Sequence, residues 1–519
     1  MMDAPFVLAT MARRGLLRPG PPHRVLQQFL ELGKWGYGLA GELRQAAVRS
    51  PGQVAVVDSS GVSYTYRELL DRSCRLGAAL PISAGDRVGV LCRNSADMIV
   101  VLIAVASVGA DPVLINTGLS SSQLAAVISA QDLKSVVHDP EFAEVLSGFS
   151  GSMDIERASS LISMSHPTVL APPARPGRTI VLTSGTTGMP KGAQRPTPGG
   201  FSPLCSIIDR IPLRAGVRMM IAAPLFHTWG FAGLQIALAL RATVVLRRRF
   251  EPAPVVELMR AQGCTALIAV PVMLQSLMEL EPDLPLPPLS VAAVSGSALP
   301  GGLATRFMDR YGDILYNLYG STEASWASIA TPADLRAAPD TAGRPPHGTA
   351  VAVLAPDGSP VAPGTTGRLF VGNEMLFEGY TNGSSRELHD GLLATGDLGH
   401  VDAAGRVYVD GREDDMIVSG GENVFPSEVE GLLADLPEVL ECAVIGVPDE
   451  EWGECVKAFV VLKPGAGATE VDIIETARSH LASYQKPRSV EFVDALPKAP
   501  TGKILKRTLR EPYWIDRQV

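Results

Sequence analysis

The chain has 519 residues, of which 46% are hydrophobic and 19% charged, a globular composition that suffices for two or more domains. A formal net charge of −9 excludes a general polyanion binder, so no nucleic-acid partner is expected. The six cysteines stand far apart, without a Cys-x-x-Cys pair or a neighbouring histidine cluster. This spacing favours reduced, buried thiols in a cytoplasmic protein over a disulfide framework or a zinc site.

The first fifty residues carry a helical spacing of apolar side chains between Pro and Gly. Residues 1–17 contain Arg13 and Arg14 but no long apolar stretch before a small-residue cleavage site, so a secretory signal is not expected. The basic residues would suit an anionic membrane surface, yet a segment docked on the following domain is the simpler interpretation. The most apolar run, residues 98–106, is too short to span a bilayer and predicts a buried helix, without stable membrane insertion.

Short apolar strands alternate with helical stretches from residue 53 to 138 and again from 204 to about 320. This alternation predicts βαβ units, which form parallel sheets covered by helices. Residues 139–178 between them are weakly patterned and rich in Ser and Pro, as in a connection. The predicted strands are residues 55–58, 86–91, 112–116, 135–138, 219–222, 243–246, 266–270 and 291–294, and the helices of the first half are residues 67–80, 97–108 and 120–128.

The pattern changes after residue 343. Strands at residues 351–354, 367–371 and 406–409, separated by turns, predict a small antiparallel barrel or meander. The charged residues 410–415 are our candidate hinge. Beyond them, helices at 427–436 and 471–481 with strands at 441–446 and 457–462 indicate a small α+β domain of ordinary size. We therefore expect a large N-terminal α/β domain, residues 1–413, and a small mobile domain, residues 414–519.

Residues 183–192 read Thr-Ser-Gly-Thr-Thr-Gly-Met-Pro-Lys-Gly and follow the apolar residues 179–182. Glycines let backbone N–H groups approach a ligand, hydroxyls donate to phosphate oxygens, and Lys191 supplies charge, so the loop suits a polyphosphate. It is not a Walker A loop, because no Gly-Lys-Ser/Thr opens a helix after it. The alternative is a mobile surface loop.

Two further groups of residues suit a nucleotide. Residues 319–323 read Tyr-Gly-Ser-Thr-Glu: Tyr319 can stack on a purine, Thr322 can donate to a phosphate, and Glu323 can hold a hard cation. The alternative is a strand end with a helix cap. Asp397, in a predicted Thr-Gly-Asp turn, can accept hydrogen bonds from a ribose diol that Arg412 shares, although an isolated Thr-Gly-Asp would indicate an ordinary Asx turn.

Taken together, these motifs resemble those of the adenylate-forming superfamily, which includes acyl-CoA synthetases, peptide-synthetase adenylation domains and luciferases. The resemblance covers residues from about 55 to 506 in the family's order. It implies an enzyme that activates a carboxylic acid with ATP and Mg²⁺ to an acyl-adenylate, then transfers the acyl group to coenzyme A. The implied site residues are Thr183, Ser184, Gly185, Thr186, Thr187 and Lys191 at the β- and γ-phosphates, Gly296, Ser297 and Ala298 beside adenine and the acid, Tyr319 on adenine, Thr322 at the α-phosphate, Glu323 on magnesium, and Asp397 with Arg412 at the ribose.

Residues 501–504, Thr-Gly-Lys-Ile, resemble the family's catalytic lysine motif. A cation at Lys503 would offset the repulsion between a carboxylate and the α-phosphate, whereas a solvated basic tail is the alternative. The resemblance also implies that the small domain rotates about Asp414 between the half-reactions. Gly420 and Gly421 would then line the pantetheine passage; the alternative for them is a plain turn.

Residues 224–231, Pro-Leu-Phe-His-Thr-Trp-Gly-Phe, lie where relatives that activate amino acids generally place an aspartate. Here His227 and Thr228 stand without an acid, which favours a plain carboxylic acid. His227 would orient the carboxylate or gate the pocket; a structural histidine is the alternative. The apolar and aromatic neighbours favour an apolar acid of some bulk: a fatty, polycyclic or aryl acid.

Other functions remain open. One alternative is an enzyme that performs only one half-reaction, making either an acyl-adenylate for a carrier protein or a thioester from a supplied adenylate. A non-catalytic nucleotide-binding protein is the third candidate, although Lys503 speaks against it. The sequence also leaves a homodimer open.

Overall fold

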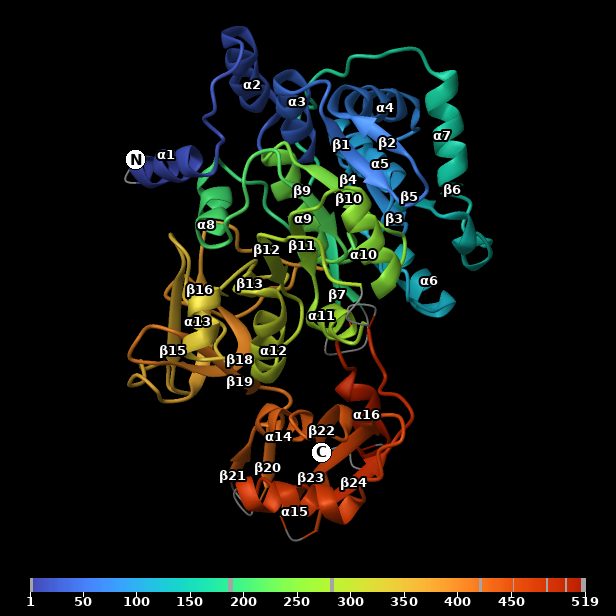
Figure 1. The fold of residues 1–519 in the computed structure, drawn as a ribbon. Helices are drawn as coiled ribbons and strands as arrows, with labels where there is room; N and C mark the ends of the chain where they lie inside the picture. The colour runs from blue at the N-terminus through green and yellow to red at the C-terminus, as the bar shows by residue number, and fades with distance from the viewer. Residues whose placement is uncertain are drawn as a thin grey trace.

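The computed structural model describes residues 3–184, 190–280, 284–419, 422–450, 452–481, 484–499 and 502–514. Within these ranges the strands form four sheets, two of them wound with helices as the βαβ pattern predicts (Figure 1). The α/β fold class is confirmed.

The first sheet has eight strands in the order β14-β13-β12-β11-β9-β10-β1-β2. Neighbouring strands pair in parallel except the edge strands β2 and β14, which pair antiparallel. The parallel strands are almost fully buried because helices cover them. The bounds are β1 Val54–Asp58, β2 Ser63–Thr65, β9 Arg218–Ile221, β10 Thr243–Leu246, β11 Ala266–Ala269, β12 Val291–Val294, β13 Leu315–Tyr319 and β14 Ser328–Ala330.

The second sheet has six strands in the order β6-β5-β3-β4-β7-β8. Its strands are parallel except for the antiparallel hairpin of β7 and β8, which flanks the predicted phosphate loop. The bounds are β3 Arg87–Leu91, β4 Asp111–Leu114, β5 Leu133–His138, β6 Ser152–Asp154, β7 Ile180–Ser184 and β8 Pro190–Gln194.

Five helices of these two layers, α4, α5, α6, α7 and α13, begin at an N-cap whose side chain accepts a backbone N–H. Ser120 caps α6, as predicted, with its side chain accepting from the backbone N–H of Gln123. The apolar run at 98–106 lies in α5, which is buried throughout all but its second residue. The bounds are α1 Ala4–Arg13, α2 Pro22–Trp35, α3 Leu39–Arg49, α4 Tyr66–Ala79, α5 Ala96–Ser107, α6 Ser121–Ala130, α7 Ile155–Met164, α8 Ser202–Arg210, α9 Thr228–Ala239, α10 Pro252–Ala261, α11 Pro271–Met278, α12 Gly301–Tyr311 and α13 Pro332–Ala337, with 3-10 turns η1 Pro140–Phe142 and η2 Glu144–Leu146.

The interpretation of residues 139–178 as a plain connection is wrong, because β6 and α7 lie within it. The start of α7 carries a clear local signal: the side chain of Asp154 accepts a hydrogen bond from the backbone N–H of Arg157. An Asp at this N-cap position was therefore visible in the sequence, but the surrounding Ser and Pro residues obscured it.

A third, antiparallel sheet of five strands follows. The prediction that residues 395–397 form a turn is wrong, since they lie inside β18. Gly396 adopts φ +76° there, a conformation open to glycine, so a turn-type glycine occurs within a strand. The bounds are β15 Ala350–Leu354, β16 Gly367–Gly372, β17 Leu388–His389, β18 Leu392–Val401 and β19 Val407–Arg412.

The remaining elements form a body with its own core, including Ile417, Val429, Val444 and Ile473. It lies at one end of the molecule (Figure 1). Residues 410–412 of the candidate hinge belong to β19, residues 413–415 lie between β19 and the first strand of this body, and the boundary at 413/414 stays a prediction. The bounds are β20 Ile417–Ser419, β21 Glu422–Val424, β22 Val439–Asp449, β23 Gly453–Leu462, β24 Ser489–Phe492, α14 Pro426–Ala434, α15 Glu470–His480 and α16 Lys506–Trp514.

The N-terminal segment is docked on the large domain, as the simpler interpretation held. Arg13 forms an ion pair of 2.6 Å with Asp209, and Arg14 Nε donates to the carbonyl of Ile208 at 2.8 Å. In the described part of the chain, no helix has both the length and the apolar character needed to cross a membrane. All six cysteines are free and buried, in line with the expectation of unpaired thiols.

Candidate active site

Polar residues gather at one edge of the first sheet. The parallel register sets Ile268 beside Ile221 and Val294 beside Ala269 and Asn317, so the carboxyl ends of β9, β11, β12 and β13 meet there. The segments that leave these ends contain His227, Val270, Gly296 and Thr322. In open α/β sheets this edge is where ligands bind.

Tyr319, Asp397 and Arg412 form one cluster. The Tyr319 hydroxyl donates to Asp397 Oδ2 at 2.6 Å, and Arg412 donates to Asp397 Oδ1 at 3.0 Å. Burial and the Asp397 carboxylate raise the pKa of Tyr319 well above its ordinary value, so its hydroxyl stays protonated as a donor. The predicted adenine and ribose residues are thus brought together from two sheets, and an incoming diol would share the carboxylate with these donors.

The predicted phosphate threonine lies beside the segment assigned to the acid. The hydroxyl oxygens of Thr228 and Thr322 are 2.7 Å apart, and Arg195 donates to the Thr322 carbonyl at 2.7 Å. Arg195 is buried, which lowers its pKa to about 10. A buried cation behind the Thr322 loop makes the local potential favourable for a phosphate.

His227 stands at the N-cap of α9 and does not cap it with its side chain. Its Nε2 is buried without a hydrogen-bond partner among the described residues. Burial lowers the pKa of His227 to about 4, so the imidazole is neutral at physiological pH. A neutral ring with an unused polar atom next to Thr228 can accept from, or donate to, a ligand there.

Glu323 is buried and tied to the phosphate hairpin. Tyr380 donates its hydroxyl to Glu323 Oε1 at 2.7 Å, and Arg386 Nε lies 3.8 Å from the same oxygen. The ammonium of Lys191 sits 5.5 Å from the centroid of the Tyr380 ring. Tyr380 therefore connects the predicted metal carboxylate with the predicted phosphate lysine.

The carboxylate of Glu323 fits a magnesium ion that arrives with a nucleotide. Mg²⁺ commonly takes one or two protein carboxylates and fills its octahedron with phosphate oxygens and waters. The described residues contain no group of three His, Cys, Asp or Glu side chains that could hold a metal without such a ligand.

The phosphate loop itself is only partly described. Thr183 Oγ1 donates to the Lys191 carbonyl at 3.4 Å across the hairpin, and Ser184 pairs with Pro190 through the backbone. The predicted residues Gly185, Thr186 and Thr187, like Gly420 and Gly421, lie outside the described residues. Gly296 adopts φ +98° at the end of β12, and the neighbouring Ser297 and Ala298 are half-buried and exposed.

Lys503 is carried toward this edge by the small domain. It lies in a short hairpin closed by the bridge of Lys498 with Ile504, and its side chain is exposed. The preceding Gly502 rests on Val272 of α11: a Cβ added at Gly502 would lie 2.3 Å from Val272 Cγ1. Because α11 directly follows β11 at the same edge, the lysine hairpin meets the large domain beside the clustered residues.

The candidate hinge is held from both sides. Arg412 Nε donates to Asp414 Oδ1 at 3.2 Å, and Arg510 of α16 donates to the Asp414 carbonyl at 3.2 Å. The helix that follows Lys503 is thereby linked to Asp414.

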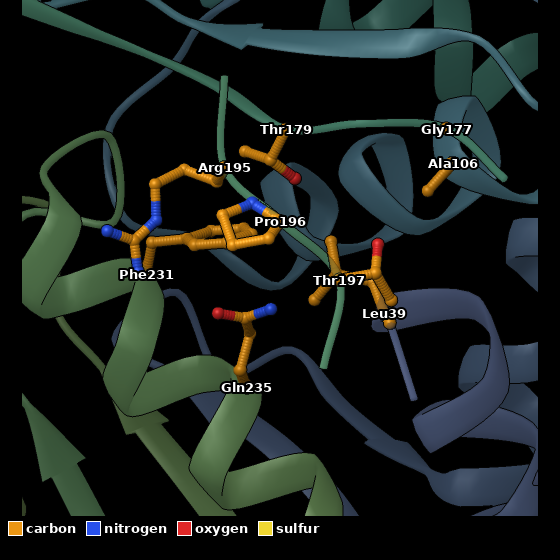
Figure 2. Close-up of a pocket in the computed structure, with 10 residues that line it drawn as sticks. Leu39, Ala106, Gly177, Thr179, Arg195, Pro196, Thr197, Phe231 and Gln235 are labelled. Carbon is orange, nitrogen blue, oxygen red and sulfur yellow. The ribbon is translucent and has the colours of Figure 1, made fainter. Parts of the chain in front are cut away.

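A small cavity lies against α9 and shares Arg195 with this edge. Phe231 and Gln235 line it together with Arg195, Thr197 and Leu39 (Figure 2). At about 20 Å³ it holds one water molecule, too little for a bulky acid.

Sequence reasoning missed Arg195, Tyr380 and Arg386. Their partners lie 57 or more residues away in the chain or, for Arg195, in a different sheet layer. An arginine four residues after Lys191 could have been recognised in the sequence as a second cation near the phosphate loop. A tyrosine in a polar loop gave no such indication.

Two protein-family models match the chain, one on each side of the candidate hinge. A family model described as AMP-binding enzyme matches residues 43–381, and one described as AMP-binding enzyme C-terminal domain matches residues 428–503. The chain belongs to this family, the adenylate-forming enzymes. Its class is that of the AMP-forming acid–thiol ligases, which use ATP, Mg²⁺ and coenzyme A.

Individual relatives are similar to this chain along nearly its whole length. A feruloyl-CoA synthase of Amycolatopsis sp is 32% identical over 498 residues, covering 93% of this chain and 99% of the relative. The long-chain-fatty-acid–CoA ligase FadD13 of Mycobacterium tuberculosis is 30% identical over 492 residues, covering 91% and 97%. The structure of ATP-bound MatB from Rhodopseudomonas palustris superposes with a TM-score of 0.84 at 26% identity, covering 92% and 99%.

Proposed function

We propose that the protein is an acyl-CoA ligase that carries out both half-reactions on an apolar or bulky carboxylic acid. The observation that carries the proposal is the 2.7 Å contact between Thr228 and Thr322, which puts the segment assigned to the acid beside the predicted α-phosphate residue. The placement of the Lys503 hairpin on α11, at the same edge, supports it.

In the first half-reaction a carboxylate oxygen attacks the α-phosphorus of ATP, and the bond to pyrophosphate breaks. Thr322 donates to the α-phosphate, and Lys503 offsets the charge that builds on the phosphoryl oxygens. His227, neutral at physiological pH, orients the carboxylate without adding a competing charge. Tyr319 lies on adenine, while Asp397 and Arg412 hold the ribose.

The ATP phosphates are held by Thr183, Ser184, Gly185, Thr186, Thr187 and Lys191. Gly296, Ser297 and Ala298 leave space between adenine and the acid. Glu323 would hold magnesium, which would supply neutralising charge to the phosphates.

In the second half-reaction the sulfur of coenzyme A attacks the acyl carbon, loses its proton, and displaces AMP. The domain of residues 414–519 turns about Asp414 to withdraw Lys503 and bring Gly420 and Gly421 to the thiol passage. The contact of Gly502 with Val272 of α11 supports an arrangement in which Lys503 serves adenylation.

The acid has no α-ammonium group in this proposal, since residues 224–231 include no Asp or Glu. The names of the two relatives point to an aryl acid and a long-chain fatty acid.

We infer a cytoplasmic location from the six free thiols. A homodimer is a compatible assembly, which light scattering tests.

The test is a panel of aryl, fatty and polycyclic acids, assayed for ATP–pyrophosphate exchange and for AMP release with and without coenzyme A. A complete ligase exchanges pyrophosphate with its acid and releases AMP in multiple turnovers only when coenzyme A is present. Exchange without thioester formation would favour an enzyme that serves a carrier protein. Nucleotide binding without exchange on any acid, unchanged in Lys503→Ala, would leave a non-catalytic nucleotide-binding protein.

A further inference from the structure

The helix α2 buries one face and leaves an apolar stripe largely exposed on the other. Leu32 and Gln28 are buried on the inner face. On the outer face Leu26, Phe29 and Leu30 are 63%, 46% and 51% exposed. Their spacing of three and four residues places them in one stripe along the helix.

This stripe lies far from the moving part of the enzyme. Figure 1 shows α2 at the end of the molecule opposite the small domain that carries Lys503. A large partner on the outer face of α2 would therefore leave both the site and the rotation of the small domain unobstructed.

The charge around α2 differs from that of the rest of the chain. Residues 3–50 contain seven Arg and Lys and three Asp and Glu, a net +4 within a chain of net −9; of these cations Arg13 is paired with Asp209, and Arg44 is buried. One of the three acids, Glu42, is buried with its pKa raised to about 8, so it is largely uncharged at neutral pH. Arg18 and Lys34 are exposed. Lys34 follows the stripe residue Leu30 by one helical turn, and its ammonium lies 4.0 Å from the Glu31 carboxylate.

We propose that the outer face of α2 docks on an anionic membrane surface. An apolar stripe edged by cations lies in the plane of a bilayer interface, with its apolar side chains among the acyl chains and its cations at the headgroups. A second copy of this chain fits less well, because a symmetric contact would bring two segments of net +4 together. Docking would place the enzyme where apolar acids concentrate, without any spanning segment.

Vesicle co-sedimentation of the full-length protein tests the proposal. The wild-type protein is expected to bind vesicles of phosphatidylcholine with phosphatidylglycerol, to bind pure phosphatidylcholine more weakly, and to be released by salt. The variant Leu26→Gln/Phe29→Gln/Leu30→Gln should lose about tenfold or more of this binding. Arg18→Gln/Lys34→Gln should weaken binding to the anionic vesicles and flatten the salt dependence.

Matched controls separate this stripe from general surface hydrophobicity. Met164 and Val169 are 81% and 97% exposed outside α2, and Met164→Gln/Val169→Gln should bind vesicles as the wild type does. Phe29 also packs edge-on against Phe201, with ring centroids 6.4 Å apart. The pair Leu26→Gln/Leu30→Gln leaves that contact intact, and thermal unfolding confirms that each variant is folded.

Three results would overturn the proposal. The first is a wild-type protein that does not bind anionic vesicles. The second is a set of α2 variants that bind as tightly as the wild type. The third is a change of particle mass in light scattering while vesicle binding stays the same, which would make α2 an interface between copies. Turnover of a water-soluble acid should be unchanged in every variant, so failure here is distinct from failure of the proposed ligase activity.

Discussion

The hydroxyl of Tyr380 donates a 2.7 Å hydrogen bond to Oε1 of Glu323, while the ring of Tyr380 lies 5.5 Å from the ammonium of Lys191. One side chain thus touches both the predicted metal ligand and the predicted phosphate ligand, and two substitutions separate these contacts. Tyr380→Phe removes the hydroxyl and keeps the ring. Tyr380→Leu removes both.

Tyr380→Phe is expected to raise the Mg²⁺ concentration for half-maximal pyrophosphate exchange by about tenfold, because a hydrogen bond to a charged group is worth roughly 1.5 kcal/mol. The KM for the acid should change little. Tyr380→Leu should in addition raise the KM for ATP. Equal Mg²⁺ requirements in wild type and Tyr380→Phe would contradict the link to Glu323.

Gly502→Ala is expected to impair adenylation. The added methyl group would lie 2.3 Å from Val272 Cγ1, so the Lys503 hairpin could no longer rest on α11. Pyrophosphate exchange should fall by more than about tenfold, since even a small misplacement of a catalytic group is costly. Thioester formation from a supplied acyl-adenylate should be retained.

The control for Gly502→Ala is Gly465→Ala. Gly465 has a similar φ of +81° but open space around its Cβ position, so this variant reports backbone strain without the clash. Equal losses in the two variants, or a Gly502→Ala enzyme that loses both half-reactions alike, would argue against docking of the hairpin on Val272.

Asp414→Pro is expected to slow thioester formation more than adenylation. Proline restricts the backbone that must turn, while among the described contacts the Asp414 backbone uses its carbonyl, toward Arg510, and not its N–H. Single-turnover measurements of the two half-reactions give the ratio. Parallel losses in both steps would rule out Asp414 as the pivot.

Glu42 is expected to make the protein less stable as pH rises. Burial raises its pKa in the folded protein from 4.5 to about 8, so between these values the folded state holds a proton that the unfolded state releases. The stability contribution is complete below about pH 4.5, falls as pH rises, and levels off above about pH 8. At pH 8 to 9 Glu42→Gln should be more stable than the wild type by up to a few kcal/mol, roughly.

Thermal unfolding at about pH 5 and pH 8.5 measures this difference. The Glu42→Gln variant keeps a side-chain oxygen for the Gln45 amide, which donates to Glu42 at 3.0 Å, so packing is preserved. The exposed Glu279→Gln is the matched control and should show the same pH dependence as the wild type. A gap between Glu42→Gln and wild type that does not grow with pH would contradict the prediction.

Much of the fold follows from local pattern. The buried strands β1, β3, β4, β5, β9, β10, β11 and β12 start and end within a few residues of the predicted apolar runs, since full burial requires continuous hydrophobic segments. The turn predicted at residues 395–397 failed because Gly396 takes its positive φ inside a strand, which local pattern does not distinguish from a turn. The elements α7, β24 and α16 were not predicted, because short or polar segments show only a weak periodicity of apolar residues.

The site residues also fall into two groups: those that are neighbours in the sequence and those that only the fold brings together. Tyr319, Thr322 and Glu323 stand together in the sequence, so their proximity was visible there. The hydrogen bond of Tyr319 to Asp397 joins residues 78 positions apart and was not predicted; the resemblance to a family only assigned both residues to one nucleotide. Nothing local pointed to Tyr380, because its importance comes entirely from what the third sheet brings near Glu323.

Because all six native thiols are buried, introduced cysteines can be labelled selectively to measure domain movement. A cysteine placed at exposed Met164 and another at exposed Val471 of α15 would be the two readily labelled positions, one on each domain. A donor and an acceptor dye at these points would report rotation of the small domain in single molecules, without first removing any native cysteine.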